Sequence, residues 1–464
     1  MNQKSLIKPV LIIALVPVLF ACEQNNRGPL RVSKINPRYF TDNSGKAIYL
    51  TGSHTWNNFV DMIPEEESTV FYYDEYIKFL TAHNHNFIRL WAWDIHTWDT
   101  KRNQSRDSLL LQVNLKPWLR TGSGVALDGK PKYDLTKFNP DYFSRLKERV
   151  QAAGEANIYV SVMLFEGWGT QFLTGAFNDH PFHPENNING IDMDTSHDSL
   201  GVKIYELGND KITELQELYV NKVIETVGGF DNVLYEISNE NHPESTEWQY
   251  HMINYVKKVE NESGKVHPVG MTFQHKGGQN QTLFDSPADW ISQGREGNYQ
   301  NNPPASNGQK VILTDTDHMW GIGGYRQWVW KSFLRGMNPI FMDPYKGRVL
   351  NKGKGDRWEQ EMRVSMGLSR KIAYKIDLIN MVPSTTIATS GYCLAAEGKE
   401  YLVYIPEGKE TNVDLTSSKG SFEVTWIDPL SGNTWAGDPI PGGNANKLVS
   451  PFETADALVH VKIK

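Results

Sequence analysis

Two mainly apolar segments of the sequence each lead into carboxylates. Segment 233–237 ends shortly before Glu240, and segment 311–314 ends directly before Asp315, which Asp317 follows. Two carboxyl groups that flank a glycosidic bond can hydrolyse it, because one protonates the leaving oxygen while the other attacks the sugar or activates water. Glu240 with either Asp315 or Asp317 is therefore a candidate catalytic pair. The alternative is that these acidic residues only cap helices that follow strands.

A carboxylate at the end of a strand is typical of parallel α/β barrels, whose active sites lie at the carboxyl ends of the strands. The sequence contains eight short, strand-like segments, separated by segments with helical periodicity. The expected strands are 47–50, 86–91, 158–165, 233–237, 267–273, 289–292, 311–314 and 338–342. This alternation predicts an α/β fold, a (β/α)₈ TIM barrel, with long loops at 101–138 and 170–208. An open, doubly wound sheet is disfavoured, because no glycine-rich turn opens a helix after the first segment.

Polar and aromatic residues follow the other expected strands and would face the same pocket. The chain has 14 Trp, 20 Tyr and 19 Phe, and many of them stand beside Asp, Asn, His or Gly. An aromatic face next to hydrogen-bonding groups suits a sugar ring, although most of these aromatic residues must fill the core. The candidate substrate-binding residues are Arg89, Asn239, His54, Trp56, Asn57, Trp93, Glu166, His318 and Trp320.

The hydrophobic pattern changes after Pro383. In segments such as 401–405 and 459–463, side chains alternate with the period of a strand, and no helical segment intervenes. The pattern predicts a small antiparallel β-sandwich at residues 389–464, which follows a catalytic barrel domain at residues 28–388.

The N-terminal segment has the features of a bacterial signal peptide. Two lysines precede an apolar run at 10–20, which is too short to span a bilayer. Segment 19–22, Leu-Phe-Ala-Cys, resembles a lipobox, whose cleavage would leave Cys22 as a lipidated first residue. We therefore expect a signal peptide at 1–22 and a lipid-anchored protein of the bacterial cell envelope, either periplasmic or on the outer-membrane surface. The alternative is a plain secretory signal with an incidental cysteine.

The amino-acid composition limits the kinds of molecule that the protein is expected to bind. Lys and Arg number 47 and Asp and Glu number 54, so the net charge is −7, which argues against a nucleic-acid groove. His180, His183, Asp192 and Asp194 could ligate a metal, but no clear third ligand accompanies either pair. We expect no metal and no other cofactor. The expected partners are an oligo- or polysaccharide substrate and a lipid anchor, and we expect a monomer.

Asn239-Glu240 after the expected fourth strand and Arg89 in the second resemble motifs of clan A glycoside hydrolases. The resemblance implies that Glu240 is the general acid/base, that a carboxylate at the end of strand seven is the nucleophile, and that Arg89 orients this nucleophile. Asp315 stands where the clan usually has glutamate, and Asp317 is the alternative. Because aspartate is one methylene shorter than glutamate, the resemblance favours a retaining mechanism without securing it.

Segment 50–56, Leu-Thr-Gly-Ser-His-Thr-Trp, and the expected sandwich together resemble a group of apiosidase-like lipoproteins from Bacteroidetes. Members of that group pair a barrel with a domain described as collagen-binding. The resemblance implies hydrolysis of O-glycosidic bonds in a complex glycan. Two other interpretations stay open: a non-catalytic lipoprotein that binds glycan or collagen, and a different hydrolase such as a peptidase, which a metal in the barrel mouth would favour.

Overall fold

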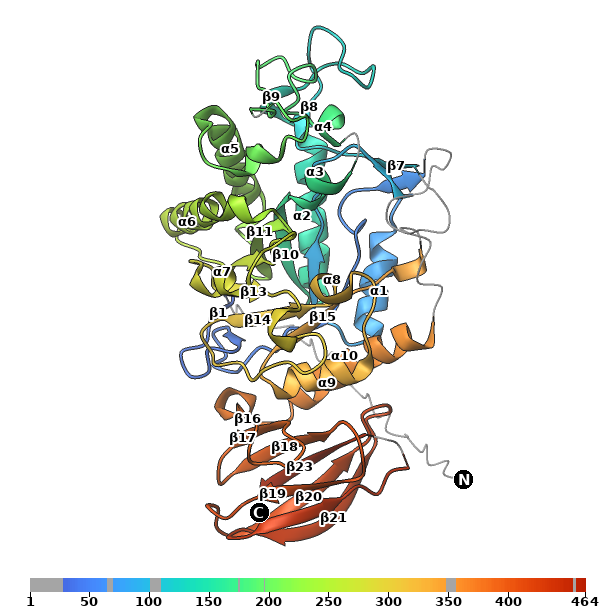
Figure 1. Cartoon of the computed structure of the whole chain (residues 1–464), viewed down its shortest axis with the longest axis vertical. Coiled ribbons are helices and arrows are strands. Elements are labelled where there is room, and N and C mark those ends of the chain that lie inside the picture. The colour runs from blue at the N-terminus through green and yellow to red at the C-terminus, as the bar shows by residue number, and fades with distance from the viewer. Residues whose placement is uncertain are drawn as a thin grey trace, which may run out of the picture.

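The computed structural model describes residues 28–64, 70–100, 110–173, 176–195, 197–347, 356–453 and 456–464. The expected signal peptide and Cys22 lie outside the described residues. Figure 1 shows a barrel of strands and helices in the upper part of the molecule and antiparallel sheets, coloured red, below it.

Eight parallel strands form the central sheet, in the order β3-β15-β14-β13-β12-β11-β10-β5. Their bounds are β3 Gly52–His54, β5 Phe87–Leu90, β10 Tyr159–Glu166, β11 Val233–Asn239, β12 Val269–Thr272, β13 Trp290–Ser292, β14 Val311–Asp315 and β15 Asn338–Met342. Nearly all of their residues are buried on both faces, as a parallel sheet covered by helices requires. The predicted TIM barrel, followed by antiparallel sheets, is confirmed.

The first barrel strand lies further along the chain than expected. Segment 47–50 instead contacts β2 (Phe40–Thr41), because the backbone N–H of Ile48 donates to the carbonyl of Phe40 at 2.8 Å. Parallel pairing begins at Gly52, where a Cβ atom would lie 2.3 Å from the carbonyl oxygen of Phe87. Glycine thus permits β3 to approach β5, and the two ends of the sheet meet in a nearly closed barrel.

Helices cover the outside of the barrel (Figure 1). They are α1 Tyr73–Ala82, α2 Pro140–Glu155, α5 Asp210–Val227, α6 Thr246–Ser263, α7 Asn280–Asp285, α9 Arg326–Leu334 and α10 Arg357–Ala373. Asn139 caps α2: its side chain accepts a hydrogen bond from the backbone N–H of Asp141 at 3.1 Å. None of the described helices is long and apolar enough to cross a membrane.

Short elements occupy the connections, including those predicted as plain loops. Above the barrel mouth are β4 Met62–Pro64, β6 Thr97–Asp99, β7 Leu110–Val113, β8 Trp118–Leu119, β9 Asp134–Phe138, α3 Trp168–Phe172, α4 Ala176–Asp179 and α8 Asp317–Trp320. The 3₁₀ turns are η2 Val202–Tyr205, η3 Pro243–Ser245, η4 Glu296–Asn298, η5 Tyr345–Gly347 and η6 Leu378–Asn380, and β1 Arg31–Val32 pairs with β2. Part of the predicted 101–138 loop, residues 101–109, lies outside the described residues.

The C-terminal region consists of antiparallel sheets. A six-stranded sheet has the order β16-β17-β18-β23-β20-β21, and β19 pairs with β22. The bounds are β16 Val382–Ser384, β17 Cys393–Ala396, β18 Glu400–Ile405, β19 Glu410–Asp414, β20 Ser421–Ile427, β21 Thr434–Pro441, β22 Ala445–Val449 and β23 Ala457–Ile463. The larger sheet therefore includes residues 382–384, which precede the predicted boundary at 389.

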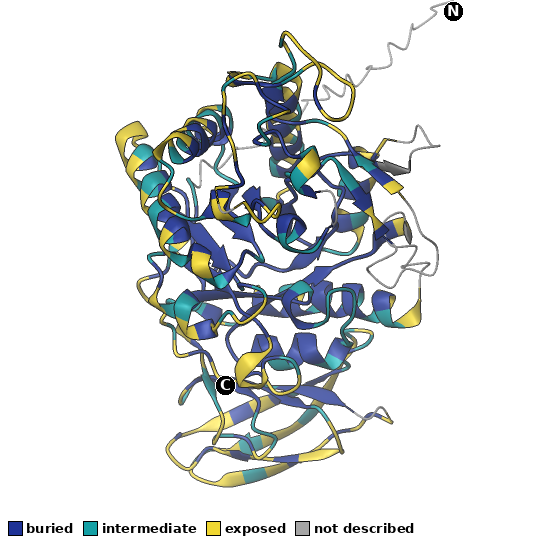
Figure 2. Ribbon diagram, turned by 45° about the horizontal axis from the view of Figure 1, so that its top comes forward, coloured by how far each residue is buried: buried dark blue, intermediate teal, exposed yellow. Residues whose placement is uncertain are grey.

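The larger sheet packs on α9 and α10 of the barrel. Trp330 and Phe333 of α9 are fully buried in one hydrophobic cluster with Leu402 and Tyr404 of β18. These aromatic side chains therefore serve packing between the barrel and the C-terminal region and lie away from the cavity. Figure 2 shows that the barrel strands are buried, whereas exposed residues gather on the outer strands of the C-terminal region.

Candidate active site

A cavity of about 800 Å³ opens at the carboxyl ends of the barrel strands. Its walls come from the loops that follow β3, β5, β10, β11, β12, β13 and β14. Among the predicted residues, those that line it are Trp56, Trp93, Asn239, Glu240, Asp317, His318 and Trp320. The volume is in the range of small-molecule sites, and the location is the usual place for chemistry in this fold.

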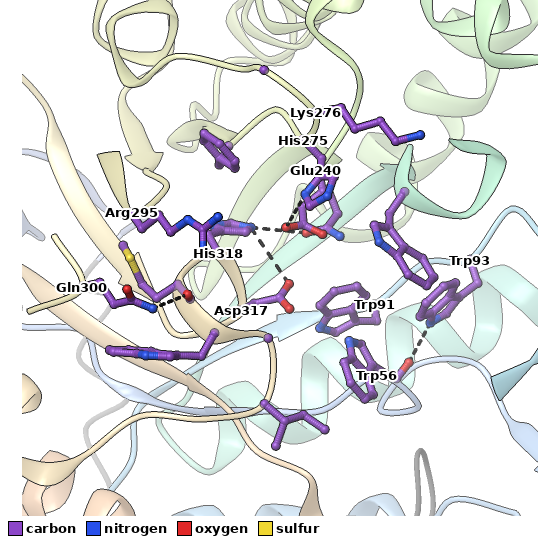
Figure 3. Close-up of a pocket in the computed structure, with 18 of the residues that line it drawn as sticks. Trp56, Trp91, Trp93, Glu240, His275, Lys276, Arg295, Gln300, Asp317 and His318 are labelled. Atoms are coloured by element: carbon purple, nitrogen blue, oxygen red, sulfur yellow. Dashed lines mark hydrogen bonds and ion pairs between the residues drawn. The ribbon is translucent and has the colours of Figure 1, made fainter. Parts of the chain in front are cut away.

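Glu240 follows β11 directly, and its carboxylate reaches the cavity with 13% of the side chain exposed. Its backbone has φ = +44°, a left-handed conformation that costs a residue with a Cβ atom about 1–2 kcal/mol. Gln171 of α3 steadies this backbone, because its Nε2 donates to the carbonyl of Glu240 at 2.9 Å. On the other side, Nδ1 of His275 lies 3.7 Å from Oε1 of Glu240 (Figure 3).

The loop after β10 can approach Glu240 only because residue 167 is a glycine. A Cβ atom on Gly167 would lie 2.3 Å from Cγ of Asn241. The same glycine carbonyl accepts the second hydrogen bond of Gln171, at 2.8 Å. The strained turn at Glu240 is therefore held by contacts specific to this loop.

Asp317 is the second carboxylate in the cavity. It begins α8, and 7% of its side chain is exposed. One oxygen lies 3.5 Å from Nη1 of Arg89 and 4.0 Å from Nε2 of His318. Burial and the negative charges of Glu240 and Asp315 raise the pKa of Asp317 well above its usual value, although Arg89 opposes this shift. Glu240 and Asp317 therefore interact electrostatically across the same cavity.

Asp315, the preferred nucleophile in the sequence analysis, lies beneath the cavity and does not line it. Its side chain is fully buried and accepts hydrogen bonds from Nη1 of Arg89 at 2.8 Å and Nε2 of His54 at 3.1 Å. The backbone N–H of Asp317 donates to it at 3.0 Å. Burial raises the pKa of Asp315, but His54 and Arg89 outweigh burial and lower it. With its oxygens already engaged, Asp315 positions its neighbours, and the geometry favours the alternative, Asp317.

Arg89 of β5 lies beneath the cavity and forms hydrogen bonds with residues of both β11 and β14. Its Nε and Nη2 donate to both oxygens of Glu236 at 2.9 and 2.5 Å, and Nη2 also donates to Oδ1 of Asn239 at 2.6 Å. All of these residues are buried. Glu236 was missed in the sequence analysis, although an acidic residue within an apolar strand is the signal that could have revealed it.

His54 is also in this buried layer. Nε1 of Trp91 donates to Nδ1 of His54 at 2.9 Å, so Nδ1 is the acceptor. The hydrogen of the neutral imidazole must then be on Nε2, which faces Asp315. His54, Arg89, Glu236 and Asp315 form one hydrogen-bonded group, named here the buried charged layer.

Tryptophan side chains form one wall of the cavity. Trp93 stacks on Trp91 with ring centroids 5.7 Å apart and on Trp98 at 5.4 Å, while Trp168 meets both Trp93 and Trp98 edge-on. Nε1 of Trp93 donates to the carbonyl of Trp56 at 2.8 Å, which fixes the ring (Figure 3). Such a wall offers flat apolar faces to a sugar ring. Trp91, Trp98 and Trp168 were not among the predicted binding residues.

Besides Arg89 and His54, two further predicted binding residues, Glu166 and Asn57, do not line the cavity. Glu166, at the end of β10, is fully buried and accepts hydrogen bonds from the backbone N–H groups of Trp168 and Gly169 at 2.7 and 3.0 Å. Burial raises the pKa of Glu166 to about 8. It therefore orients the loop that carries Trp168. Asn57 borders a separate small hollow beside Phe71 and Tyr345, because the chain turns away from the cavity after Trp56.

The cavity residues on the loops after β12 and β13 were also missed in the sequence analysis. His275, Lys276 and Gly277 follow β12, and Arg295 and Gln300 follow β13. Their strands are short and their loops lack a motif, so only their position after strands could have indicated them. Within the described residues, no group of three or more His, Cys, Asp or Glu side chains could hold a metal ion.

Comparisons with known proteins agree with the architecture. The profile of a "Domain of unknown function (DUF6298)" matches residues 78–290, and that of a "Putative collagen-binding domain of a collagenase" matches residues 379–458. No curated protein matches the chain.

Solved structures of glycoside hydrolases share the fold. A glycoside hydrolase family 5 protein from Bacteroides vulgatus has a TM-score of 0.62 at 12% identity, with 94% of each chain covered. A second B. vulgatus structure, also titled a glycoside hydrolase, has a TM-score of 0.64 at 12% identity, covering 95% of this chain and 83% of that one. At this identity the likeness establishes the fold, a TIM barrel with a C-terminal antiparallel domain.

Proposed function

We propose that the protein is a glycoside hydrolase that cleaves O-glycosidic bonds in a complex glycan. The observation that carries this proposal is the pairing of Glu240 and Asp317 in one cavity with a tryptophan wall at the carboxyl ends of the barrel strands. This is the arrangement that glycoside hydrolysis needs: two carboxyl groups beside a surface that holds the sugar. The fold shared with glycoside hydrolases supports the proposal.

In the proposed mechanism, Glu240 protonates the leaving oxygen and Asp317 acts from the other side of the sugar. Asp317 either attacks the anomeric carbon, giving retention, or activates water, giving inversion. Arg89 and the side chain of Asp315, which accepts a hydrogen bond from the backbone N–H of Asp317, hold Asp317 in place. If Asp317 is the nucleophile, its charge disappears in the glycosyl ester, and Glu240 can then accept a proton from the incoming water.

A glycan digest tests this proposal. The mature protein is incubated with a panel of bacterial, plant and host glycans, and products are identified by mass spectrometry. Proton NMR of the first product distinguishes retention from inversion. The variant Glu240→Gln should lose about 10²–10⁴-fold in rate on substrates with poor leaving groups and much less on activated aryl glycosides, because only the former need protonation.

The matched control is Glu244→Gln. Glu244 begins the next turn of the chain, and its side chain is exposed outside the cavity. It should retain full activity. Equal and small losses for Glu240→Gln on both kinds of substrate would exclude Glu240 as the acid, and no cleavage of any glycan would contradict the hydrolase proposal.

A second candidate function is binding of collagen or glycan without hydrolysis. The match of residues 379–458 to the collagen-binding profile favours it. Pull-down with fibrillar collagen, with and without the C-terminal region, is the measurement. Strong collagen binding by a protein that cleaves no glycan would favour this alternative.

We also propose that Cys22 carries a lipid anchor in the bacterial cell envelope. The lipobox-like segment that ends in Cys22 supports this. Metabolic labelling with an alkyne fatty acid should label the wild type and not the Cys22→Ser variant. Equal labelling of the wild type and the variant would mean that the lipid is attached to a residue other than Cys22.

A further inference from the structure

The loops after β12 and β13 bring cationic side chains to the rim of the cavity, at two separate points (Figure 3). Lys276 and Arg295 lie there, and both are exposed. Figure 3 shows Arg295 extending toward His318, on the side of the cavity away from Trp56 and Trp93. The two cations therefore border the space that a bound sugar chain would occupy.

Neither cation forms an ion pair with any residue that the structure describes. The ammonium of Lys276 lies 4.3 Å from the ring centroid of Phe172. Glu296, next to Arg295, accepts a hydrogen bond from the backbone N–H of Asn280 at 2.8 Å. No carboxylate of the described chain neutralises the guanidinium of Arg295.

The acidic groups of the cavity do not supply the missing counter-charge. Among the described lining residues, the carboxylates are Glu240 and Asp317, which the proposed reaction uses. General basicity does not explain the cations either, because the chain has a net charge of −7. A guanidinium offers N–H donors in a planar fork that matches the oxygens of a carboxylate or a sulfate, and an ammonium adds a point charge.

We propose that Lys276 and Arg295, which lie at separate points on the rim of the cavity, form a subsite for anionic substituents, carboxylates or sulfates, of a glycan chain. This inference rests on the proposed function and specifies its substrate class. The tryptophan wall holds the sugar rings by their apolar faces, while the two cations select chains that carry negative charges. The cations also attract such chains from solution over a distance set by the ionic strength.

Binding measured by isothermal titration calorimetry, without turnover, tests the subsite. One pair of probes is oligogalacturonides and their carboxyl-reduced counterparts, and another is carrageenan oligosaccharides and their desulfated counterparts. We expect the charged member of at least one pair to bind more tightly than its neutral counterpart. This preference should weaken as salt is raised, whereas binding of the neutral member should not.

The variant Arg295→Ala should lose about tenfold in affinity for the charged probe, and Lys276→Ala/Arg295→Ala about 100-fold, since charge-assisted contacts of this kind are individually strong. Arg295→Lys should fall between the wild type and Arg295→Ala, because it keeps the charge without the fork. The matched control Lys371→Ala/Lys419→Ala removes two exposed cations from α10 and the C-terminal region. It should leave the affinity unchanged.

A preference for the carboxylated probe identifies a uronic acid as the source of the charge, and a preference for the sulfated probe identifies a sulfated sugar. Equal affinity within both pairs, or equal losses in the cavity variant and the control, overturns the subsite. Charge-selective binding by a protein that hydrolyses nothing would keep the subsite and contradict the hydrolase. A protein that hydrolyses only neutral glycans would support the hydrolase proposal and contradict the subsite.

Discussion

The buried charged layer and the cavity above it contain the same kinds of side chain in opposite situations. In the layer, Arg89, Glu236 and Asp315 are fully enclosed and satisfy one another with hydrogen bonds of 2.5 to 2.9 Å. In the cavity, Glu240 and Asp317 have few partners and remain partly exposed. A carboxylate that is fully buried beneath the cavity cannot reach a bound sugar, so proximity to the reaction does not by itself identify a catalytic residue.

The largest predicted effect is a difference in activity and stability between variants of Asp317 and variants of Asp315. Asp317→Asn should reduce turnover by at least about 10⁴-fold, the order seen when a reacting group is removed. Its melting temperature should stay the same or rise, because the pKa of Asp317 is raised and its charge therefore opposes folding near neutral pH. Asp315→Asn should instead lower the melting temperature, since it leaves Arg89 with one fewer counter-charge.

Azide rescue sharpens this test. Asp317→Gly opens space at the proposed reacting position, so added azide should restore turnover of an activated glycoside and give a glycosyl azide. The control Asp141→Asn, at an exposed position in the first turn of α2, should be unaffected. Rescue of Asp315→Gly, but not of Asp317→Gly, would identify Asp315, at the end of β14, as the nucleophile.

The next effect concerns the stability of the layer. Glu236→Ala should lower the free energy of unfolding by about 3–5 kcal/mol, because it leaves the buried Arg89 without its bidentate partner. Chemical denaturation monitored by circular dichroism measures this. Glu225→Ala is the control: Glu225 is exposed on the surface of α5 and pairs with Lys222 one turn away, and such a surface pair contributes about 0–1 kcal/mol. Similar losses in both variants would show that the layer is not held by its ion pairs.

The difference between the two regions also explains what could be predicted from the sequence. The alternation of strands and helices was sufficient to predict the barrel. A short, almost continuous apolar segment such as 158–165 is typical of a buried strand in a parallel sheet. Asp315 ends β14 and Asp317 stands two residues further on, so an alternating pattern places both on the same side, and the sequence offers no means of choosing between them. The choice depends on where His54 and Arg89 reach from β3 and β5, which only the closed barrel determines. The same holds for Arg295 and Lys276, whose loops carry no motif.

A smaller effect should arise at Gln171, whose hydrogen bond to Glu240 is made to the backbone carbonyl and not to the carboxylate. Gln171→Ala removes the hydrogen bond to the strained turn, so the carboxylate of Glu240 should be less well placed. We expect about a tenfold loss in kcat on substrates with poor leaving groups, little change on activated aryl glycosides, and an unchanged KM. Gln281→Ala, on the surface of α7, is the control. An equal loss on both kinds of substrate would indicate a general structural defect instead of misplacement of the acid.

The smallest effect is a shift in the acidic limb of the pH–rate profile. Asp317 must be ionised to react, and burial together with Glu240 and Asp315 raises its pKa. In the wild type, kcat/KM on an activated aryl glycoside should therefore fall, as the pH is lowered, at a higher pH than ordinary aspartate titration would give. Glu240→Gln removes one of the negative charges, so the pKa of Asp317 should fall and the acidic limb should move to lower pH. Glu244→Gln should leave the limb in place, because its side chain lies outside the cavity. An acidic limb that does not respond to Glu240→Gln would mean that the two carboxylates are not electrostatically coupled, and the contrast between the cavity and the layer beneath it would lose its functional meaning.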